Sequence, residues 1–398
     1  MGWTEHAIWW HVYPLGFTGA PIRGTDPQPA PRLRRLLHWL DYAIGLGTSG
    51  LLLGPIFTSE THGYDTLDHF AIDPRLGTLD DFDELIAACR ARGLRVVLDG
   101  VFSHVGRSHP DLTRALRDGH PGIFDIENGE PRVFEGHDSL ARLNHRNPET
   151  IDYTTRVMTH WLDRGIDGWR LDAAYSVDTA FWRETLARVR AEHPDAWFLA
   201  EVIHGDYGAF AAASTVDSVT QYELWKAIWS SLADRNFFEL DWSLQRHNGH
   251  LTNVDLNTFV GNHDVTRIAT TVGPEGALVA LAILLTVGGT PSIYYGDEQG
   301  FTGVKEERVG GDDAIRPAYP DEPGQLAPWG KTLHRAHQDL IGLRRRHPWL
   351  RTATTKSLAL SNTEYTYRVS GGTDHLDVSL TPSTVRIVDA AGQTLWKS

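Results

Sequence analysis

The sequence predicts an α/β fold in which eight strand–helix units close into a (β/α)8 barrel. Short apolar or β-branched runs alternate with longer segments of helical periodicity along most of the 398 residues. This alternation is typical of βαβ units, which place their strands parallel in one sheet. The span from residue 1 to about 346 has the usual length for a closed barrel of eight such units.

Eight runs are expected to form the strands of this barrel, and the sixth has the weakest pattern. They are residues 7–14, 48–54, 94–100, 166–172, 197–202, 218–222, 256–262 and 291–296. The helices between them have conventional ends. One begins after Thr78 with acidic residues and stops near Arg90 and Gly93, as helix capping and the helix dipole favour.

Two regions depart from a bare barrel. Residues 104–149 form a long insertion after the third strand, rich in Gly, Pro, Asp and Arg, and loops of that length are uncommon unless they are functional. After residue 350 the pattern changes to short polar strands at 363–370, 375–380 and 384–390. We therefore predict that residues 1–103 and 150–350 form the barrel, that 104–149 form a small inserted domain, and that 351–398 form a small antiparallel β domain.

Charge and cysteine content exclude several classes of partner and site. The chain has 37 basic and 51 acidic side chains and a formal net charge of −14, which argues against nucleic acid as a ligand. Cys89 is the only cysteine, so a disulfide, an iron–sulfur cluster and a thiolate zinc site are excluded. Its sequence context predicts a buried helical thiol.

No membrane partner and no secretion signal are expected. Residues 1–14 contain no basic region followed by an apolar run and a small-residue cleavage site. Together with the unpaired Cys89, this predicts a cytoplasmic protein. The longest apolar stretch, 276–289, holds about a dozen apolar residues, fewer than the roughly 20 that a membrane span needs. It is predicted to be a core helix.

Polar side chains gather at the carboxyl ends of the predicted strands, where a barrel enzyme carries its reaction pocket. They are Tyr13 on the first strand, His62, Tyr64 and Asp65 just beyond the second, Asp99 on the third, Arg170 and Asp172 on the fourth, Glu201 on the fifth, and Asn262, His263 and Asp264 on the seventh. Any one of these is explained equally well as a cap or an ion-pair partner. As a set, the four carboxylates of the third, fourth, fifth and seventh strands repel one another on one rim unless a ligand or a shared proton relieves them.

Cleavage of a glycosidic bond requires such an arrangement and needs no cofactor. One carboxyl donates a proton to the departing oxygen while a carboxylate faces the anomeric carbon. The two must differ in protonation at neutral pH, which neighbouring charges can arrange. Arg170 is two residues before Asp172 and therefore on the same strand face, so we expect it to hold Asp172 ionised.

These segments resemble the recurrent motifs of the α-amylase family of glycoside hydrolases, in the same order and at the same spacing. The matching segments are TSGLLLGPIFTS, DGVFSH, GWRLDAA, FLAEV, FVGNHD and TPSIYYGDE, together with HGYDTLDHFAIDPRLGT after the second strand and LARLNHRNPE in the insertion. The resemblance covers residues 7 to about 346. It implies a TIM barrel with the insertion as a small B domain and residues 351–398 as a shortened C-terminal domain.

The resemblance also implies a role for each rim residue. Asp172 matches the nucleophile, which forms a covalent glycosyl-enzyme, and Glu201 matches the general acid that later activates water. Asp264 matches the third carboxylate, which binds sugar hydroxyls near the reacting carbon. The substrate-binding residues are Tyr64 under the reacting sugar, His104 and His263 on its hydroxyls, Arg170 beside the nucleophile, and Asp99 supporting the site from behind. Retention of configuration is expected, with the Asp172 and Glu201 carboxyls about 5 to 5.5 Å apart.

Within the family, the chain is most similar to the cyclomaltodextrinase and neopullulanase branch, although the additional N-terminal β domain of that branch has no counterpart in it. Many relatives place a calcium-binding Asn before the histidine of the third-strand motif, whereas this sequence has Ser103. A hydroxyl is a poorer ligand for a hard cation than an amide carbonyl. We therefore expect no metal and no cofactor. The same resemblance places Arg316, in the last barrel loop, within reach of the cleft.

Four functions follow from these residues. The first is a retaining hydrolase acting on α-glucosidic bonds of short or cyclic α-glucans, with an oligosaccharide as partner. The second is a transglycosylase or sugar isomerase that uses the same intermediate, and the third is a non-catalytic carbohydrate-binding barrel. The fourth, a metal-dependent hydrolase, is disfavoured because no strand end carries closely paired histidines. The nearest pairs, His104 with His109 and His247 with His250, are expected at a surface or on sugar. Residues 225–238 carry aromatics at helical spacing, which favours a core or cleft wall.

Overall fold

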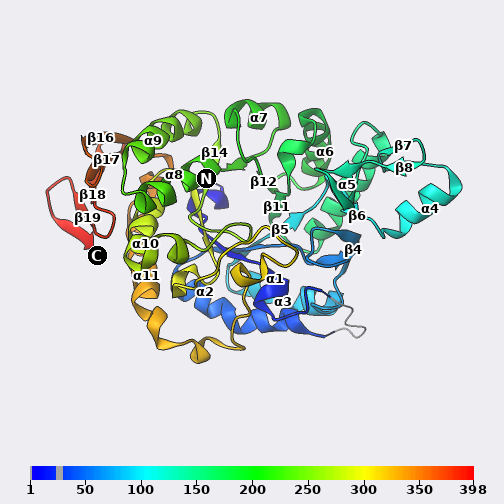
Figure 1. Ribbon diagram of the computed structural model, residues 1–398, viewed down its shortest axis with the longest axis horizontal. Helices are drawn as coiled ribbons and strands as arrows, with labels where there is room; N and C mark the ends of the chain where they lie inside the picture. The colour runs from blue at the N-terminus through cyan, green and yellow to red at the C-terminus, as the bar shows by residue number, and fades with distance from the viewer. Residues whose placement is uncertain (1, 24–29) are drawn as a thin grey trace.

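The computed structural model describes residues 2–23 and 30–398, and it confirms the predicted (β/α)8 barrel (Figure 1). Eight parallel strands close in the order β1-β15-β14-β13-β12-β11-β5-β2, so each strand pairs with its neighbours along the chain and β1 pairs with β15. All eight predicted strands are present, including the sixth. The barrel strands are β1 (Trp9–Val12), β2 (Gly50–Leu53), β5 (Arg95–Gly100), β11 (Gly168–Leu171), β12 (Trp197–Ala200), β13 (Ser218–Thr220), β14 (Asp255–Thr258) and β15 (Thr290–Tyr294).

Helices surround the barrel and bury its outer face. They are α1 (Pro14–Phe17), α2 (Leu40–Leu46), α3 (Leu79–Ala91), α5 (Pro148–Asp163), α6 (Thr179–Glu192), α7 (Tyr207–Ser214), α8 (Tyr222–Ala233), α9 (Phe238–Leu251), α10 (Ile268–Thr286) and α11 (Lys331–Arg346). Helix α3 starts where the sequence predicts, because Thr78 and Asp81 form a reciprocal capping box. Cys89 in that helix is buried, and burial raises the pKa of its thiol to about 12.

Helix α10 contains the long apolar run that was predicted to form a core helix. Its 19 residues are long and apolar enough to cross a membrane by length and composition alone. Residues 279–286, however, are buried within the protein, where α10 packs against α8 and α11. The predicted core helix is therefore present. It is longer than its apolar core suggests, because it is extended at its start across a kink at Gly273 and Pro274.

The insertion after β5 contains short strands and one helix. Strands β6 (His104–Gly106), β10 (His137–Arg142) and β9 (Val133–Phe134) form a small antiparallel sheet, and β7 (Ile126–Glu127) pairs with β8 (Glu130–Pro131). Helix α4 (Pro110–Asp118) packs Leu112 and Ala115 onto this sheet beside Phe124. Strands β3 (Phe57–Ser59) and β4 (Thr66–Ile72) form a hairpin after β2 that carries the Tyr64 loop.

The C-terminal region is an antiparallel sheet, as predicted, but it has five strands rather than three. They are β16 (Thr354–Leu360), β17 (Tyr365–Gly371), β18 (Asp374–Leu380), β19 (Val385–Asp389) and β20 (Thr394–Lys397). In Figure 1 this sheet and the insertion lie on opposite sides of the barrel. The sheet is anchored to the barrel helices by the hydroxyls of Tyr367 and Thr286, 2.9 Å apart, and by the Tyr365 hydroxyl, which donates to Asp241.

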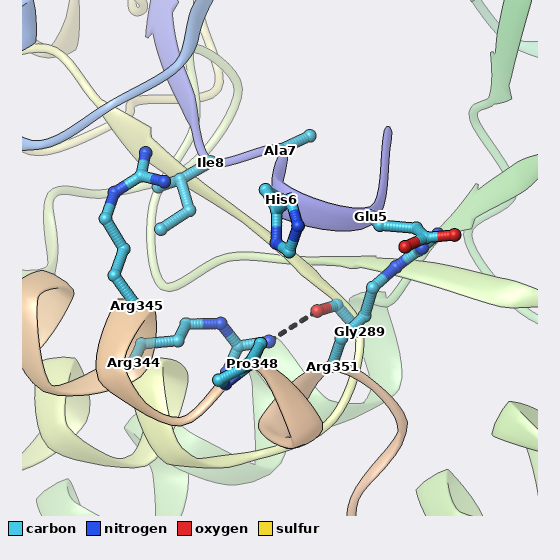
Figure 2. A pocket seen from close by; sticks show the side chains of 9 residues that line it. All are labelled: Glu5, His6, Ala7, Ile8, Gly289, Arg344, Arg345, Pro348 and Arg351. Atoms are coloured by element: carbon cyan, nitrogen blue, oxygen red, sulfur yellow. Dashed lines mark hydrogen bonds between the residues drawn. The ribbon is translucent and has the colours of Figure 1, made fainter. Parts of the chain in front are cut away.

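The amino end of the barrel carries a small basic pocket of about 220 Å³ (Figure 2). Arg344 is buried there and donates hydrogen bonds to the backbone carbonyls of Leu285, Val287 and Gly289 at 3.0, 2.8 and 2.5 Å. The Leu285 carbonyl lies in the last turn of α10 and the other two lie just after it, where a helix has no backbone donors left for its carbonyls. Arg344 therefore joins α11 to the entry of β15.

Candidate active site

Arg170 stands at the centre of the candidate site and contacts three carboxylates. Its Nη1 lies 2.6 Å from Asp99 and 3.2 Å from Asp172, and its Nη2 lies 2.7 Å from Glu201. Asp99 and Arg170 are directly paired across β5 and β11, and both side chains are buried. Asp172 and Glu201 follow the last residues of β11 and β12, so the parallel register brings them to the same rim.

Glu201 pairs with Arg170 and receives hydrogen bonds from two further groups. The Ala173 backbone N–H donates to it at 2.9 Å and the Tyr222 hydroxyl at 3.0 Å. Ala173 directly follows Asp172 and has a left-handed backbone, with φ 44° and ψ 38°. Such conformations cost about 1–3 kcal/mol for a residue other than glycine and concentrate at functional sites. Here the strained residue aims its N–H at the carboxylate of the neighbouring strand.

Asp264 lies at the other edge of the site, on a loop rather than on a strand. The seventh strand was predicted to run to residue 262, whereas β14 ends at Thr258. Asn262 fixes the loop by accepting the Asp264 backbone N–H at 2.9 Å. The Asp264 carboxylate lies 2.9 Å from His263 Nε2 and accepts a hydrogen bond from Arg316 at 3.1 Å. Arg316 thus reaches the site.

Tyr64 connects the two halves of the site. Its hydroxyl donates to Asp99 at 2.9 Å and is also hydrogen-bonded to His263 Nε2. The rings of Tyr64 and His263 stack nearly parallel, with centroids 5.2 Å apart. The contacts from Asp172 through Arg170 and Asp99 to Tyr64, His263 and Asp264 are therefore continuous. The structure brings together seven of the eight predicted site residues.

Among the described residues, His104 is the predicted site residue that forms no hydrogen bond with this cluster of carboxylates. Its Nδ1 lies 2.8 Å from the Ser103 hydroxyl and its Nε2 lies 2.9 Å from the Tyr64 backbone carbonyl. Burial lowers the pKa of His104 to about 4, so the ring is neutral at physiological pH. The imidazole is stacked on Phe134 of the insertion, with centroids 4.3 Å apart. It therefore supports the Tyr64 loop, and its contact with a sugar hydroxyl stays a prediction.

The charges of the site push its carboxyl pKa values in opposite directions. Burial and the neighbouring Glu201 raise the pKa of Asp172 well above its usual value, against the opposing effect of Arg170. For Asp264, burial acts upward but is outweighed by His263 and Arg316, so the pKa of Asp264 falls below its usual value. The structure thus differs from the expectation that Arg170 keeps Asp172 ionised, because the same guanidinium also serves Asp99 and Glu201.

Sequence reasoning missed two residues that touch this network. Tyr222 ends the predicted sixth strand and binds Glu201, so the rule that singled out polar residues at strand ends also applied to its hydroxyl. His11 lies two residues before Tyr13 on β1, and its ring meets His263 edge to face, with centroids 5.2 Å apart. His11 Nε2 and His263 Nδ1 are both buried without a hydrogen-bond partner among the described residues. A single histidine inside an apolar strand gave no signal in the sequence.

The histidines weighed as metal ligands have other surroundings. His109 and His247 were expected at a surface or on sugar, which is wrong because both are buried. His109 Nδ1 accepts the Asp111 backbone N–H at 3.2 Å. In α9, His247 Nε2 lies 3.0 Å from the Gly288 carbonyl and its Nδ1 is 3.2 Å from Gln221. Within residues 2–23 and 30–398, no three His, Cys, Asp or Glu side chains are grouped to hold a metal ion. The Ser103 hydroxyl is bonded to His104. These residues do not fit the calcium site of many relatives.

Comparisons with known proteins agree with the geometry of the barrel. The model of the α-amylase catalytic domain matches residues 12–125 and 123–321. A cyclomaltodextrinase from a Bacillus species is 31% identical over 89% of this chain and 68% of its own length. Neopullulanase 2 from Thermoactinomyces vulgaris is 30% identical over 86% of this chain and 63% of its own length. The chain therefore spans about two thirds of the length of these curated relatives.

A solved structure of similar size has the same fold. The ligand-free cyclic α-maltosyl-(1→6)-maltose hydrolase from Arthrobacter globiformis superposes with a TM-score of 0.82 and 26% identity, covering 100% of this chain and 99% of that one. The similarity thus extends through the insertion and the C-terminal sheet. On the family match and these relatives, the chain belongs to the α-amylase family and is a glycoside hydrolase.

Proposed function

We propose that this chain is a retaining hydrolase of α-glucosidic bonds in short or cyclic α-glucans. Asp172 is the nucleophile, Glu201 is the general acid and base, and Asp264 binds the hydroxyls of the reacting sugar. The observation that carries the proposal is the single Arg170 guanidinium that contacts both Asp172 and Glu201 at the carboxyl ends of adjacent strands. Glycosidases need two carboxyls facing one glycosidic bond, and this contact places two of them together.

The roles of the two carboxyls are taken from their match to the family motifs, because the raised pKa of Asp172 does not by itself assign it the ionised role. In the first step Glu201 gives a proton to the leaving oxygen while Asp172 attacks the anomeric carbon. In the second step Glu201, now a carboxylate, takes a proton from water, which attacks the glycosyl ester and releases the sugar. Asp264 has a lowered pKa, so it stays ionised throughout and can accept hydrogen bonds from two sugar hydroxyls.

The substrate class is supported by the relatives. Two of them are named cyclomaltodextrinase and neopullulanase, and the structural neighbour is named as a hydrolase of a cyclic maltosyl-maltose. His263 and Arg316 contact Asp264, and Tyr64 stacks on His263, which supports binding of one pyranose ring beside them. Short or cyclic α-glucans are therefore the substrates that we propose.

We also propose a cytoplasmic location. A maltogenic amylase from Bacillus subtilis that is named intracellular is 28% identical over 76% of this chain and 57% of its own length. Cys89 is a free, buried thiol, which requires no oxidising compartment.

The test combines product analysis with trapping of the intermediate. The enzyme is incubated with maltose, maltotriose, isomaltose, trehalose, sucrose and cyclodextrins, and proton NMR follows the anomer that is released first. We expect the α-anomer first from maltotriose or a cyclodextrin, and a fluorinated glucosyl fluoride should label Asp172, as mass spectrometry of the peptides would show. Release of the β-anomer, or label on another carboxylate, would contradict the mechanism. Early appearance of oligosaccharides longer than maltotriose would show that transfer dominates over hydrolysis.

A further inference from the structure

One buried arginine at the amino end of the barrel lacks a counter-charge. Five arginine side chains are buried among the described residues. Four of them have a carboxylate at 3.1 Å or less, in the pairs Arg75–Asp73, Arg170–Asp99, Arg267–Asp297 and Arg316–Asp264. The fifth, Arg344, forms no ion pair with any described carboxylate. A buried charge is costly unless an opposite charge accompanies it, so the position of Arg344 calls for a negative partner.

The three backbone carbonyls that Arg344 contacts offset its charge only in part. They lie at and just after the end of helix α10 and present partial negative charge, but a carbonyl carries no net charge. Burial lowers the pKa of Arg344 to about 10, against the weaker opposing effect of Asp255. Burial acts downward on the other four buried arginines too, yet their pKa values are raised, because carboxylates and tyrosines beside them outweigh it. Among the five, the charge of Arg344 is therefore the least compensated.

Arg344 lines the basic pocket of Figure 2, which is also lined by Arg345, Arg351 and His6. Three of the five N–H groups of Arg344 serve the carbonyls, so two remain for another acceptor. Arg345 donates to the Gly47 carbonyl and has no ion pair in the described part of the chain. The pocket volume of about 220 Å³ equals that of roughly seven water molecules, which suits a small anion.

The acidic side chains at this pocket lie on its Arg351 side. Arg351 Nη2 lies 3.1 Å from Asp255, at the start of β14. Glu5 is the acid among the lining residues, and Figure 2 shows it on the same side as the end of Arg351, with Arg345 on the opposite side. The side that carries Arg345 is therefore basic, and the two arginines without a carboxylate, Arg344 and Arg345, are both in the lining.

We propose that this pocket binds a phosphate group, with Arg344 and Arg345 as its cationic partners and His6 beside them. At pH 7 a phosphate monoester carries a charge of about −1.5 to −2, which matches two arginines, whereas a carboxylate would neutralise one of them. Phosphate oxygens accept paired hydrogen bonds from a guanidinium group. The source is either the free phosphate ion or the phosphate of a small organic ester. The pocket and the carboxylate cluster lie at opposite ends of the strands, so this site does not depend on the proposed function.

Isothermal titration calorimetry of the full chain tests this proposal with two probes, inorganic phosphate and α-glucose 1-phosphate. Chloride keeps the ionic strength constant, so that binding is not confused with general screening of charge. We expect saturable binding of one phosphate per chain, with a dissociation constant on the order of 1 mM or below. Tighter binding of the ester than of the ion would identify an esterified phosphate as the ligand, and equal or tighter binding of the ion would identify free phosphate.

Arg345 and its neighbour Arg346 supply the matched variants. Both are exposed residues of α11, but Arg346 does not line the pocket. Arg345→Gln should weaken phosphate binding roughly tenfold, through the loss of one charge-assisted contact. Arg345→Lys keeps the charge and should recover part of that loss. Arg346→Gln removes the same net charge and should leave the dissociation constant within about twofold of wild type.

Thermal unfolding and kinetics of the enzyme locate the bound phosphate. At phosphate concentrations about ten times the dissociation constant, the melting temperature should rise by roughly 2 °C in the wild type and by less in Arg345→Gln. Phosphate should not compete with maltotriose, because Arg344 lies at the other end of the strands from Asp172. No saturable binding, equal losses in Arg345→Gln and Arg346→Gln, or competition with maltotriose would overturn the inference. These outcomes leave the proposed function untouched, because the calorimetry measures binding without turnover.

Discussion

The two ends of this barrel treat buried charge in opposite ways. At the amino end, the buried Arg344 guanidinium donates hydrogen bonds to three neutral backbone carbonyls and shares none of them with a carboxylate. At the carboxyl end, Asp99, Asp172 and Glu201 share the single guanidinium of Arg170. A buried polar group with full partners stabilises a fold, whereas crowded like charges cost stability and are kept where a ligand or a reaction needs them. The comparison separates structural from catalytic charge within one barrel.

The largest effect should come from removing the nucleophile. Asp172→Asn should lower kcat on maltotriose by at least about 10⁴-fold, because the glycosyl ester can no longer form. The same change removes one of three carboxylates around Arg170, so the melting temperature should stay equal or rise, as relief of crowding in active sites often does. Calorimetry and initial rates measure the two effects. A variant that loses stability as well as activity would show that the carboxyl end is built for structure too.

A change at the amino end should give the reverse result. Arg344→Met leaves three carbonyls without donors, and the free energy of unfolding should fall by about 3 kcal/mol. Rates per folded molecule should be unchanged, since Arg344 lies at the opposite end of the strands from Asp172. Chemical denaturation and active-site titration check both.

Arg345 supplies the matched control for that experiment. It is the next residue of α11, is exposed, and donates only to the Gly47 carbonyl. Arg345→Met should cost less than about 1 kcal/mol. A loss as large as that of Arg344→Met would mean that the number of carbonyl partners does not set the cost.

The smallest expected effects are changes in stability with pH, and they distinguish Asp172 from Asp264 within the carboxyl end of the barrel. Burial and Glu201 raise the pKa of Asp172, so the folded state holds this proton more tightly than the unfolded state. Its ionisation therefore destabilises the fold as pH rises above about 4, the ordinary value for an aspartate. The pKa of Asp264 is lowered, and its contribution is present above about 4 and is lost as pH falls below it.

Two amide variants measure these signs. The melting temperature of Asp172→Asn, relative to wild type, should improve as pH rises from about 4 to about 8. Asp264→Asn should melt below wild type at neutral pH, and that difference should narrow as the solution becomes acidic. Parallel curves for the two variants would contradict opposite pKa shifts in one site.

Much of the fold was predictable because strands and helices bury faces at different periods. The eight apolar runs and the Thr78 cap are local signals, and the structure confirms the strands and the helix start that they predict. Asp99, Asp172 and Glu201 were predictable as polar residues at strand ends. The end of β14 at Thr258 was not, because the loop that carries Asp264 is as apolar as the strand before it.

Residues whose role depends on distant contacts gave no such signal. Arg344 belongs to a run of three arginines that is typical of a solvated helix end, and its burial depends on carbonyls more than fifty residues away. His11 looks like an ordinary barrel residue until β1 is closed against β15 and its ring meets that of His263. Sequence reasoning therefore identified the carboxylates better than the groups that position them.

The two nitrogens of the Arg170 guanidinium contact the two carboxyls whose charges change during turnover. In the proposed cycle, Asp172 is negative and Glu201 neutral before attack, and the reverse holds once the glycosyl ester has formed. One nitrogen of the guanidinium faces each of the two carboxyls. The negative charge thus moves from the carboxyl beside Nη1 to the carboxyl beside Nη2, while the total negative charge of the two carboxyls is constant. Such a transfer requires little reorganisation of the surroundings, which is how a rigid, buried cation can serve both halves of a two-step reaction.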